Sequence, residues 1–297
     1  MSRGVGELAA VEALPEAVVV AAALLTQLGD VWFLFGLVGL LYWFGGALPA
    51  PVALGRRRAA FVVALGLGAN ALVTTLKEWL ARPRPPGAGT ATAPAAVPEA
   101  VDSLYVAAAT GTGFGFPSGH ALGTAAVYGG LALVVGTRRA YVTAAAVTVV
   151  VALTRVVLGV HYLVDVVVGA AVGAAFLAVV YRLCGRGSNP GRALMLAVAA
   201  ALLGPVVGEY NFDTMAALGA ALGARIAWGV VGDAVVREAT TRGGGAVSAG
   251  VGAAFGVLFG VVYALEPAPH VAFLSMGVVL AGVLAAPLAG EAVARRV

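Results

Sequence analysis

The chain has 297 residues, of which 61% are hydrophobic and 11% are charged, and its formal net charge is +4. A water-soluble domain needs roughly 25% charged residues to cover its surface, so this composition excludes a soluble enzyme, a coiled coil and a disordered chain. The 42 glycines stand mostly in apolar runs, as in helices that pack closely within lipid. The composition therefore predicts an all-α, multi-span membrane protein.

A helix needs about 20 apolar residues to cross roughly 30 Å of hydrocarbon. By this criterion the sequence predicts a polytopic transmembrane helical bundle of about nine spans, at residues 24–46, 59–81, 119–136, 140–158, 162–182, 193–209, 214–234, 246–265 and 271–291. Residues 5–28 are also apolar, but Glu7, Glu12, Pro15 and Glu16 favour an amphipathic helix that lies on the membrane surface.

The positions of the arginines indicate how the chain is oriented. Lys77 is the only lysine, and twelve of the eighteen cations fall in alternate connections or at the C-terminal end. These twelve are Arg56, Arg57, Arg58, Arg138, Arg139, Arg182, Arg186, Arg192, Arg237, Arg242, Arg295 and Arg296. Because basic residues favour the cytoplasmic side, the long connection at residues 82–117 is expected to face outward. A connection of this length is usually functional or disordered.

The first of three notable motifs closes the second predicted span. Lys77 is followed seven residues later by Arg84, which stands between Pro83 and Pro85. The spacing is about two helical turns, so both cations point the same way if the helix persists to Arg84. A pair of interfacial cations at a helix end is the simpler interpretation, but positive charge is disfavoured on this side of the membrane.

The second motif, Phe116-Pro117-Ser118-Gly119-His120, opens the third predicted span. A Ser-Gly pair at a helix N-terminus presents free backbone N–H groups and the positive end of the helix dipole, which together favour an anion. The alternative is an ordinary helix N-terminus followed by a histidine that has no functional role.

The third motif runs from Thr154-Arg155 through His161 to Asp165. His161 and Asp165 are predicted to lie four residues apart on one helix, which makes their side chains neighbours. A carboxylate beside an imidazole fixes its tautomer and supports positive charge on the ring. A structural Arg–Asp pair is the alternative, but ionisable groups within a bilayer are costly and are functional by default. All three motifs are predicted at the outer ends of spans two to five, where they can converge.

Together the motifs resemble the signature of the type 2 phosphatidic acid phosphatase superfamily, which includes glucose-6-phosphatases and vanadium haloperoxidases. That signature is Lys, six residues, Arg-Pro; then Pro-Ser-Gly-His; then Ser-Arg, five residues, His, three residues, Asp. The sequence differs at one position, where Thr154 replaces Ser and keeps the hydroxyl group. The resemblance covers residues 55–185.

The resemblance implies a role for each matched residue. His161 would be the nucleophile, oriented by Asp165, and His120 would protonate the leaving group and then activate water. The residues implied in phosphate binding are Lys77, Arg84, Ser118, Gly119 and Arg155.

We therefore expect a phosphatidic acid phosphatase-like catalytic membrane domain at residues 1–185 and a C-terminal transmembrane extension at residues 186–297. The expected activity is hydrolysis of a lipid phosphate or isoprenyl diphosphate at the extracytoplasmic face of the cell membrane, through a phosphohistidine. No cofactor or metal is expected, and the single cysteine, Cys184, excludes an internal disulfide and a cysteine-based metal cage. Membrane lipids are the expected partners, and no nucleic acid is expected.

Three other functions remain open. Nine spans also resemble the layout of glucose-6-phosphatases, which favours a soluble phosphomonoester as the alternative substrate. A phosphohistidine can pass its phosphoryl group to an alcohol, which would make the protein a lipid phosphotransferase. A transporter or scaffold that kept the fold is the non-catalytic alternative, although the intact motifs argue against it.

In the extension, the spacings Gly219–Gly223 and Gly252–Gly256–Gly260 are interpreted as helix-packing faces. Arg225, near the middle of the seventh span, is expected to pair with a group of another span or to line a headgroup cavity.

Overall fold

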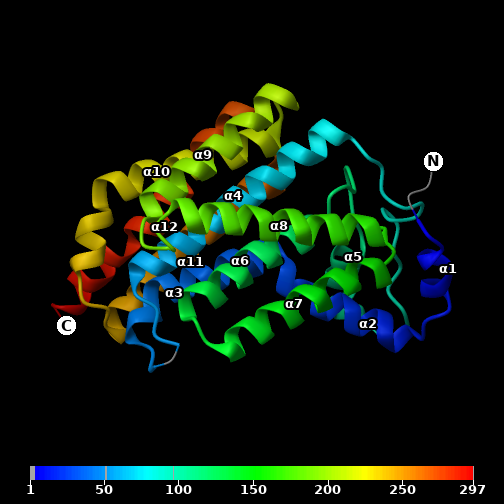
Figure 1. Ribbon diagram of the computed structural model, residues 1–297, viewed down its shortest axis with the longest axis horizontal. Coiled ribbons are helices and arrows are strands. Elements are labelled where there is room, and N and C mark those ends of the chain that lie inside the picture. Colours follow the sequence, from blue (N-terminus) through cyan, green and yellow to red (C-terminus); the bar gives the residue numbers. More distant parts are fainter. Residues whose placement is uncertain (1–3, 51, 96, 297) are drawn as a thin grey trace.

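The computed structural model describes residues 4–50, 52–95 and 97–296, and all the regular secondary structure in these ranges is helical. The helices form one elongated bundle, with the N-terminus and the C-terminus at opposite ends (Figure 1). The α-helices are α1 (Glu7–Glu12), α2 (Glu16–Leu25), α3 (Val31–Phe44), α4 (Arg56–Leu80), α5 (Asp102–Ala109), α6 (Gly119–Val135), α7 (Arg138–Val157), α8 (Leu163–Leu183), α9 (Pro190–Val207), α10 (Phe212–Arg237), α11 (Arg242–Leu265) and α12 (Pro269–Ala294). Three short 3₁₀ helices are η1 (Thr26–Gly29), η2 (Gly45–Ala47) and η3 (Glu99–Val101).

The membrane-spanning character of the bundle is confirmed, but the number of spans differs from the nine predicted. Seven helices, α4 and α7 to α12, are long and apolar enough to cross a membrane, and a bent pair of helices would make an eighth. Helix α6, the third predicted span, has 17 residues, a length of about 25 Å. It is short because its N-terminus begins inside the bundle, where Gly119 faces Val73 and Lys77 of α4.

The first predicted span, residues 24–46, is not one straight helix. The segments Glu16–Gly29 and Val31–Ala47 are bent by 47° relative to each other, and the break falls at Asp30. The expected surface helix at residues 5–28 is also divided, because α1 ends at Glu12 and α2 then joins the bent apolar pair. Asp30 is the physical reason for the first break, because its extended backbone ends one helix and begins the next.

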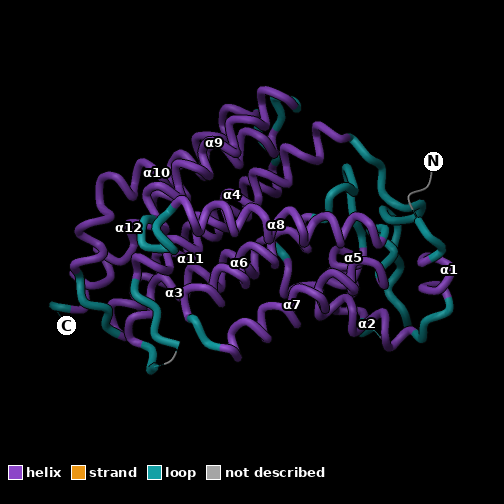
Figure 2. The backbone as a smooth tube through the Cα atoms, viewed as in Figure 1, coloured by secondary structure: helices purple, strands orange, loops and turns teal. Residues whose placement is uncertain are grey.

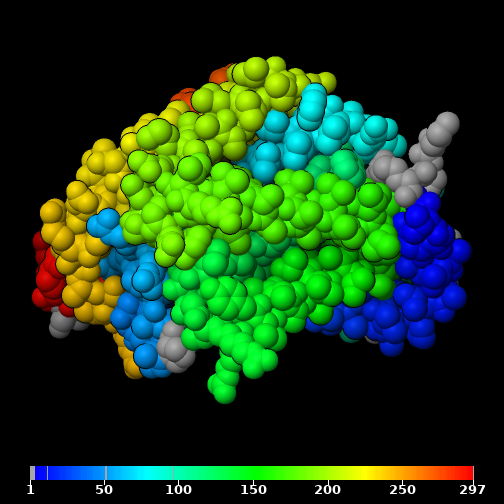
Figure 3. Space-filling view, in the orientation of Figure 1, coloured from blue at the N-terminus to red at the C-terminus, as the bar shows by residue number. Residues whose placement is uncertain are grey.

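Helix α4 is the buried centre of the bundle. It contacts α6 on one side and α9 and α10 on the other, and most of its residues up to Thr75 are buried. In the space-filling view, green and yellow-green segments that include α8 and α9 cover much of the visible face (Figure 3). Helix α6 packs between α7 and α8. The α6–α8 contact is close because a Cβ at Gly169 of α8 would lie 2.6 Å from the carbonyl oxygen of Ser118.

The C-terminal helices form a second packed group beside α4. Helices α10 and α12 meet at Gly219 and Gly223, where an added Cβ would overlap the α12 backbone, so this predicted packing face is confirmed. The other predicted face is only partly right. Gly252 packs against Trp43 of α3, whereas a Cβ at Gly256 or Gly260 would meet nothing within 4 Å.

A buried ion pair ties the C-terminal group to the start of α4. Nη2 of Arg56 lies 2.6 Å from Oε1 of Glu291 in α12, and both side chains are almost fully buried. Arg56 also donates to the carbonyl of Glu238 just after α10, and the Thr241 hydroxyl donates to Glu291. Because each partner meets an opposite charge and further hydrogen bonds, neither charge is left uncompensated.

Arg225 does not meet the expectation of a partner in another span. It is half-buried on α10, and within the described ranges it makes no hydrogen bond or ion pair, nor does it line either cavity described below. The long connection at residues 82–117 is partly helical, since it contains η3 and α5. Its loops lie at the end of the bundle that also carries α1 (Figure 2).

Candidate active site

Lys77 and Arg84 reach the site from different kinds of backbone. Lys77 lies in the last turn of α4, which ends at Leu80 because the prolines that follow disfavour helix. The condition for a shared direction of Lys77 and Arg84, a helix that persists to Arg84, is therefore not met, and the predicted span end near residue 81 is confirmed. Arg84 is instead held by backbone carbonyls, since its Nε donates to Thr112 at 2.9 Å and its Nη1 donates to Val160 at 3.0 Å.

The end of the long connection closes tightly over Arg84. A Cβ at Gly111 would lie 2.7 Å from Nη1 of Arg84, and one at Gly115 would lie 2.9 Å from its Cγ. The Gly115 amide also donates to the carbonyl of Arg82 at 2.8 Å. The absence of side chains at these two glycines lets the connection fix a long, charged side chain at the edge of the site.

The second motif starts α6, as predicted. Ser118 is the N-cap residue, and its amide donates to the carbonyl of Asp165 at 3.0 Å, which links the second motif to the third. The Ser118 hydroxyl is buried, with no hydrogen-bond partner among the described residues, and it does not line the cavity. Gly119 and His120 do line the cavity, which therefore lies beside the first turn of α6, where backbone N–H groups have no partner within the helix.

The third motif is arranged differently from the prediction. His161 lies in the connection between α7 and α8, so His161 and Asp165 do not share a helix. Asp165 lies in the first turn of α8, where its Oδ2 accepts from the backbone amide of Tyr162 at 3.1 Å. This cap brings Oδ2 to 3.4 Å from Nδ1 of His161, which is a close charge contact but no hydrogen bond, since Nδ1 has no hydrogen-bond partner among the described residues. The two side chains are therefore neighbours through a helix cap.

Arg155 comes from the last turn of α7 and is buried. Its Nη1 donates to the hydroxyl of Thr26 at 3.0 Å and to the carbonyl of Ala108 at 3.2 Å. Thr154, the one departure from the resembled signature, donates its hydroxyl proton to the carbonyl of Val151 at 2.7 Å. The Thr154 hydroxyl is thus bonded within α7, whereas the neighbouring Arg155 lines the cavity described next.

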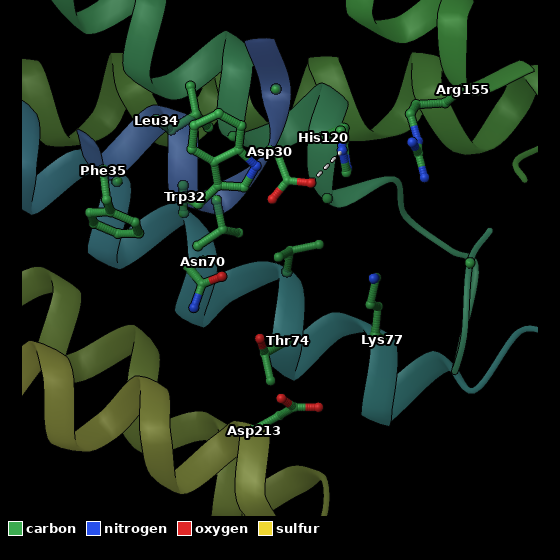
Figure 4. A pocket seen from close by; sticks show the side chains of 18 of the residues that line it. Asp30, Trp32, Leu34, Phe35, Asn70, Thr74, Lys77, His120, Arg155 and Asp213 are labelled. Carbon is green, nitrogen blue, oxygen red and sulfur yellow. Dashed lines mark ion pairs between the residues drawn. The ribbon is translucent and has the colours of Figure 1, made fainter. Parts of the chain in front are cut away.

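A cavity of about 580 Å³, the polar cavity, brings most of these groups together. Six of the eight predicted site residues line it, namely Lys77, Arg84, Gly119, His120, Arg155 and His161, while Ser118 and Asp165 lie behind its wall. Lys77, His120 and Arg155 lie around the same opening in Figure 4. None of the three cations forms an ion pair with a carboxylate in the described part of the chain. Such a wall of cations without carboxylate partners suits an oxyanion such as phosphate.

Asp30 also lines the polar cavity, and the sequence analysis did not identify it as a candidate site residue. Its Oδ2 lies 3.8 Å from Nε2 of His120, and both residues line the polar cavity (Figure 4). Asp30 stands at the break between η1 and α3, far from the motifs in the sequence. An acidic residue inside an apolar run is the signal that could have identified it, because such a residue in a bilayer is functional by default.

Helix α4 adds further polar groups to the cavity. Asn70 and Thr74 lie seven and three residues before Lys77, on the same face of the helix, and both line the cavity. Asp213 of α10 also lines it, on the side of Thr74 in Figure 4. Among the described residues, no group of three or more His, Cys, Asp or Glu side chains is arranged to hold a metal ion.

The hydrogen bonds of His161 define its state. Nη1 of Arg84 lies 3.0 Å from Nε2, and a guanidinium can only donate, so Nε2 accepts and the ring proton is on Nδ1, facing Asp165. Burial lowers the pKa of His161 well below its usual 6.5, and the cations Arg84, Arg155 and Lys77 lower it further. The imidazole is therefore neutral at pH 7, with a lone pair on the nitrogen that faces the cations.

The comparison with protein families agrees with this arrangement. The family model of the PAP2 superfamily matches residues 58–187, close to the residues 55–185 that carry the predicted resemblance. No curated protein and no solved structure matches the chain. The match supports the predicted resemblance to this superfamily of phosphatases over residues 58–187, and the chain is a multi-pass membrane protein.

Proposed function

We propose that this protein hydrolyses a lipid phosphate or isoprenyl diphosphate, without a metal ion, at the extracytoplasmic face of the cell membrane. The observation that carries the proposal is the wall of the polar cavity, which combines three cations without carboxylate partners and two histidines. Phosphoryl transfer depends mainly on positioning and on stabilising the charge of the transferred group. The cations on the cavity wall can position a phosphate group and stabilise its charge.

His161 is the nucleophile in this proposal. Its Nε2 forms a bond to phosphorus while the bond from phosphorus to the leaving oxygen breaks, which gives a phosphohistidine. Asp165, 3.4 Å from Nδ1, supports the positive charge that the ring gains during attack. A neutral ring is required at the start, and the lowered pKa of His161 supplies it.

Arg84 has two successive tasks. In the structure its Nη1 donates to Nε2, the same lone pair that must attack phosphorus. When phosphate enters, Nη1 is expected to turn to a non-bridging oxygen, which frees the lone pair. Its bonds to the carbonyls of Thr112 and Val160 keep the guanidinium within reach during this exchange. Lys77, Arg155 and the N–H groups at the start of α6 bind the other oxygens.

His120 is the acid that protonates the leaving oxygen and then takes a proton from the attacking water. Protonated imidazole is stabilised by a nearby carboxylate, and Asp30 stands 3.8 Å from Nε2. Asp30 is thus a positioning residue for His120, as Asp165 is for His161. When water attacks phosphorus, the bond to Nε2 of His161 breaks, and inorganic phosphate leaves.

The activity is tested with purified protein in the presence of EDTA, offered phosphatidic acid, an isoprenyl diphosphate and glucose 6-phosphate. Turnover of a lipid substrate that survives the chelator supports the proposal. Preference for glucose 6-phosphate would favour the soluble-substrate alternative, and phosphorylation of an added alcohol would reveal transfer. Loss of activity with EDTA that Mg²⁺ restores would contradict the metal-independent mechanism.

The side of the membrane is tested by cysteine labelling with an impermeant reagent on intact cells. Native Cys184 is fully buried and gives a low background. Ala95 and Ser188 are both exposed, in the long connection and in the α8–α9 connection. We expect Ala95→Cys to be labelled and Ser188→Cys to be protected, and the reverse result would invert the orientation.

A further inference from the structure

A second cavity lies beside the polar cavity, and its lining is almost wholly apolar. This apolar chamber has a volume of about 240 Å³. Its walls come from α3, α4, α10, α11 and α12, with side chains that include Trp43, Leu67, Ala220, Met276 and Leu280. The far wall therefore belongs to the C-terminal helices, which lie outside residues 58–187 matched by the family.

The chamber and the polar cavity adjoin. Residues that line both include Trp32, Phe35 and Val38 of α3, Asn70 of α4, and Phe259 and Tyr263 of α11. In Figure 4, Phe35 stands on one side of Asn70, and Lys77 and Arg155 stand on the other. The space thus changes from cationic to apolar across the Asn70 side chain, as an amphiphile with an anionic head requires.

The chamber also reaches the outer surface of the bundle. Gly36 of α3 and Gly256 of α11 both line it, and both are exposed. A Cβ at either position would meet nothing within 4 Å. Helices α3 and α11 contact each other, and these two glycines leave open space beside that contact at the outer surface of the bundle.

We propose that the apolar chamber holds the hydrocarbon chain of the substrate, with the seam between α3 and α11 as its lateral entrance. This proposal rests on the proposed function and narrows its substrate to a lipid with a long chain beside the phosphate. The α10–α12 helices then have a role, because they supply the wall against which the chain packs. A small sugar phosphate would leave the chamber unused.

The chamber is expected to select and position the chain rather than to extract it from the bilayer. Lipid tails are as apolar as the chamber wall, so the transfer gains little from the hydrophobic effect. The gain lies in alignment, because a chain held between α3 and α11 places its phosphate against Lys77 and His161. Since the chamber opens to the bilayer at Gly36 and Gly256, the rest of a longer chain can remain in the membrane.

The test fills the chamber without touching the polar cavity. Gly256→Leu and, from the opposite wall, Gly36→Leu add a side chain where there is open space. We expect kcat/KM for a long-chain lipid phosphate to fall about tenfold or more, while kcat/KM for a chain-free aryl phosphate stays unchanged. Gly250→Leu and Gly260→Leu are matched controls, because both lie in open space on α11 and neither lines the chamber. Both controls should behave as wild type on both substrates.

A second measurement does not depend on turnover. A non-hydrolysable long-chain phosphonate with a photoreactive group at the end of its chain should crosslink to α11 or α12 in the wild-type protein. An equal loss of kcat/KM on the lipid and the aryl phosphate, or crosslinks confined to other helices, would contradict the proposal that the chamber holds the hydrocarbon chain. A wild-type protein that hydrolyses neither substrate would refute the proposed function, whereas the crosslinking result would still decide whether the chamber holds a chain.

Discussion

The two ends of α4 each carry a buried cation, and they differ in how its charge is compensated. In the first turn, Nη2 of Arg56 lies 2.6 Å from Oε1 of Glu291, and Arg56 also donates to the backbone carbonyls of Val235 in α10 and Glu238 just after it. In the last turn, Lys77 shares a cavity with two arginines, and none of the three has a carboxylate partner among the described residues. The first arrangement holds helices together, whereas the second presents charge to a ligand.

The difference teaches how to separate a structural cation from a functional one in a membrane protein. Both ends look alike in the sequence, because each is a basic residue at the end of an apolar run. Burying a charge is costly unless it is paired, so an end that pairs its charge internally adds to stability. An end that leaves three cations unpaired lowers stability, and that cost is consistent with selection for a function.

The variant with the largest expected effect is His161→Ala. We expect turnover to fall at least ~10⁴-fold, because no other group on the cavity wall is placed to attack phosphorus. Covalent phosphate should disappear as well, measured by trapping labelled phosphate on the denatured protein. Rescue by a substrate with a better leaving group, or label found on His120 instead, would reverse the two histidine roles.

His120→Ala should have the next largest effect, and one that depends on the substrate. Loss of a general acid costs about 10²–10⁴-fold when the leaving group needs protonation. An activated aryl phosphate leaves without that help, so it should retain more relative activity than an alkyl phosphate. Equal losses on the two substrates in steady-state kinetics would show that His120 does not act on the leaving group.

The two ends of α4 are compared directly by Lys77→Met and Glu291→Gln. Lys77→Met should lower kcat/KM by about 10²–10³-fold and leave the thermal midpoint in detergent no lower, because Lys77 makes no ion pair with a described residue. Glu291→Gln should leave Arg56 unpaired and cost about 3–5 kcal/mol of stability, with the activity of the folded fraction kept. If the two variants gave the same pattern, the division into a structural and a functional end would fail.

Sequence spacing was sufficient to predict that residues of the three motifs come together, and six of the eight line the polar cavity. It was insufficient for backbone details that neighbouring segments decide. Whether His161 and Asp165 share a helix depends on where α7 stops, and the 3.4 Å contact arises from a helix cap instead. Asp30 was missed because its partner, His120, is ninety positions away, and only the fold places them together.

The same limit applies to the C-terminal helices. Small-residue spacing correctly predicts the packing at Gly219 and Gly223 of α10, but the same spacing recurs on α11, where a Cβ at Gly256 or Gly260 would meet nothing within 4 Å. Spacing identifies residues that allow close approach, and the tertiary structure decides which of them a neighbouring helix covers. A glycine packed against a neighbouring helix, such as Gly219, allows close contact, whereas a glycine that lines a cavity and is not covered, such as Gly256, leaves open space.

The pH dependence of kcat/KM tests how Arg84 affects the protonation of His161. The pKa of His161 is lowered by burial and then by Arg84, so protonation of the nucleophile should limit kcat/KM only well below pH 6.5. Arg84→Gln removes one cation, which raises the pKa of His161 and moves this acid limb toward higher pH. The variant should therefore lose relatively more activity at pH 5.5 than at pH 8. An acid limb that stays in place would mean that Arg84 does not set the protonation of His161.

Asp30→Asn should give the smallest change. Asp30 is partly exposed and lies 3.8 Å from Nε2 of His120, beyond hydrogen-bond range, so its support is weaker than that of Asp165 for His161. We expect kcat for an alkyl phosphate to fall about tenfold or less, ~1.4 kcal/mol, with KM little changed. The basic limb of the pH profile should move to lower pH, because protonated His120 loses a neighbouring negative charge.

An aryl phosphate should be less affected, and in a His120→Ala background Asp30→Asn should have no further effect. An additional loss in that double variant would mean that Asp30 acts on phosphate or on the fold rather than through His120.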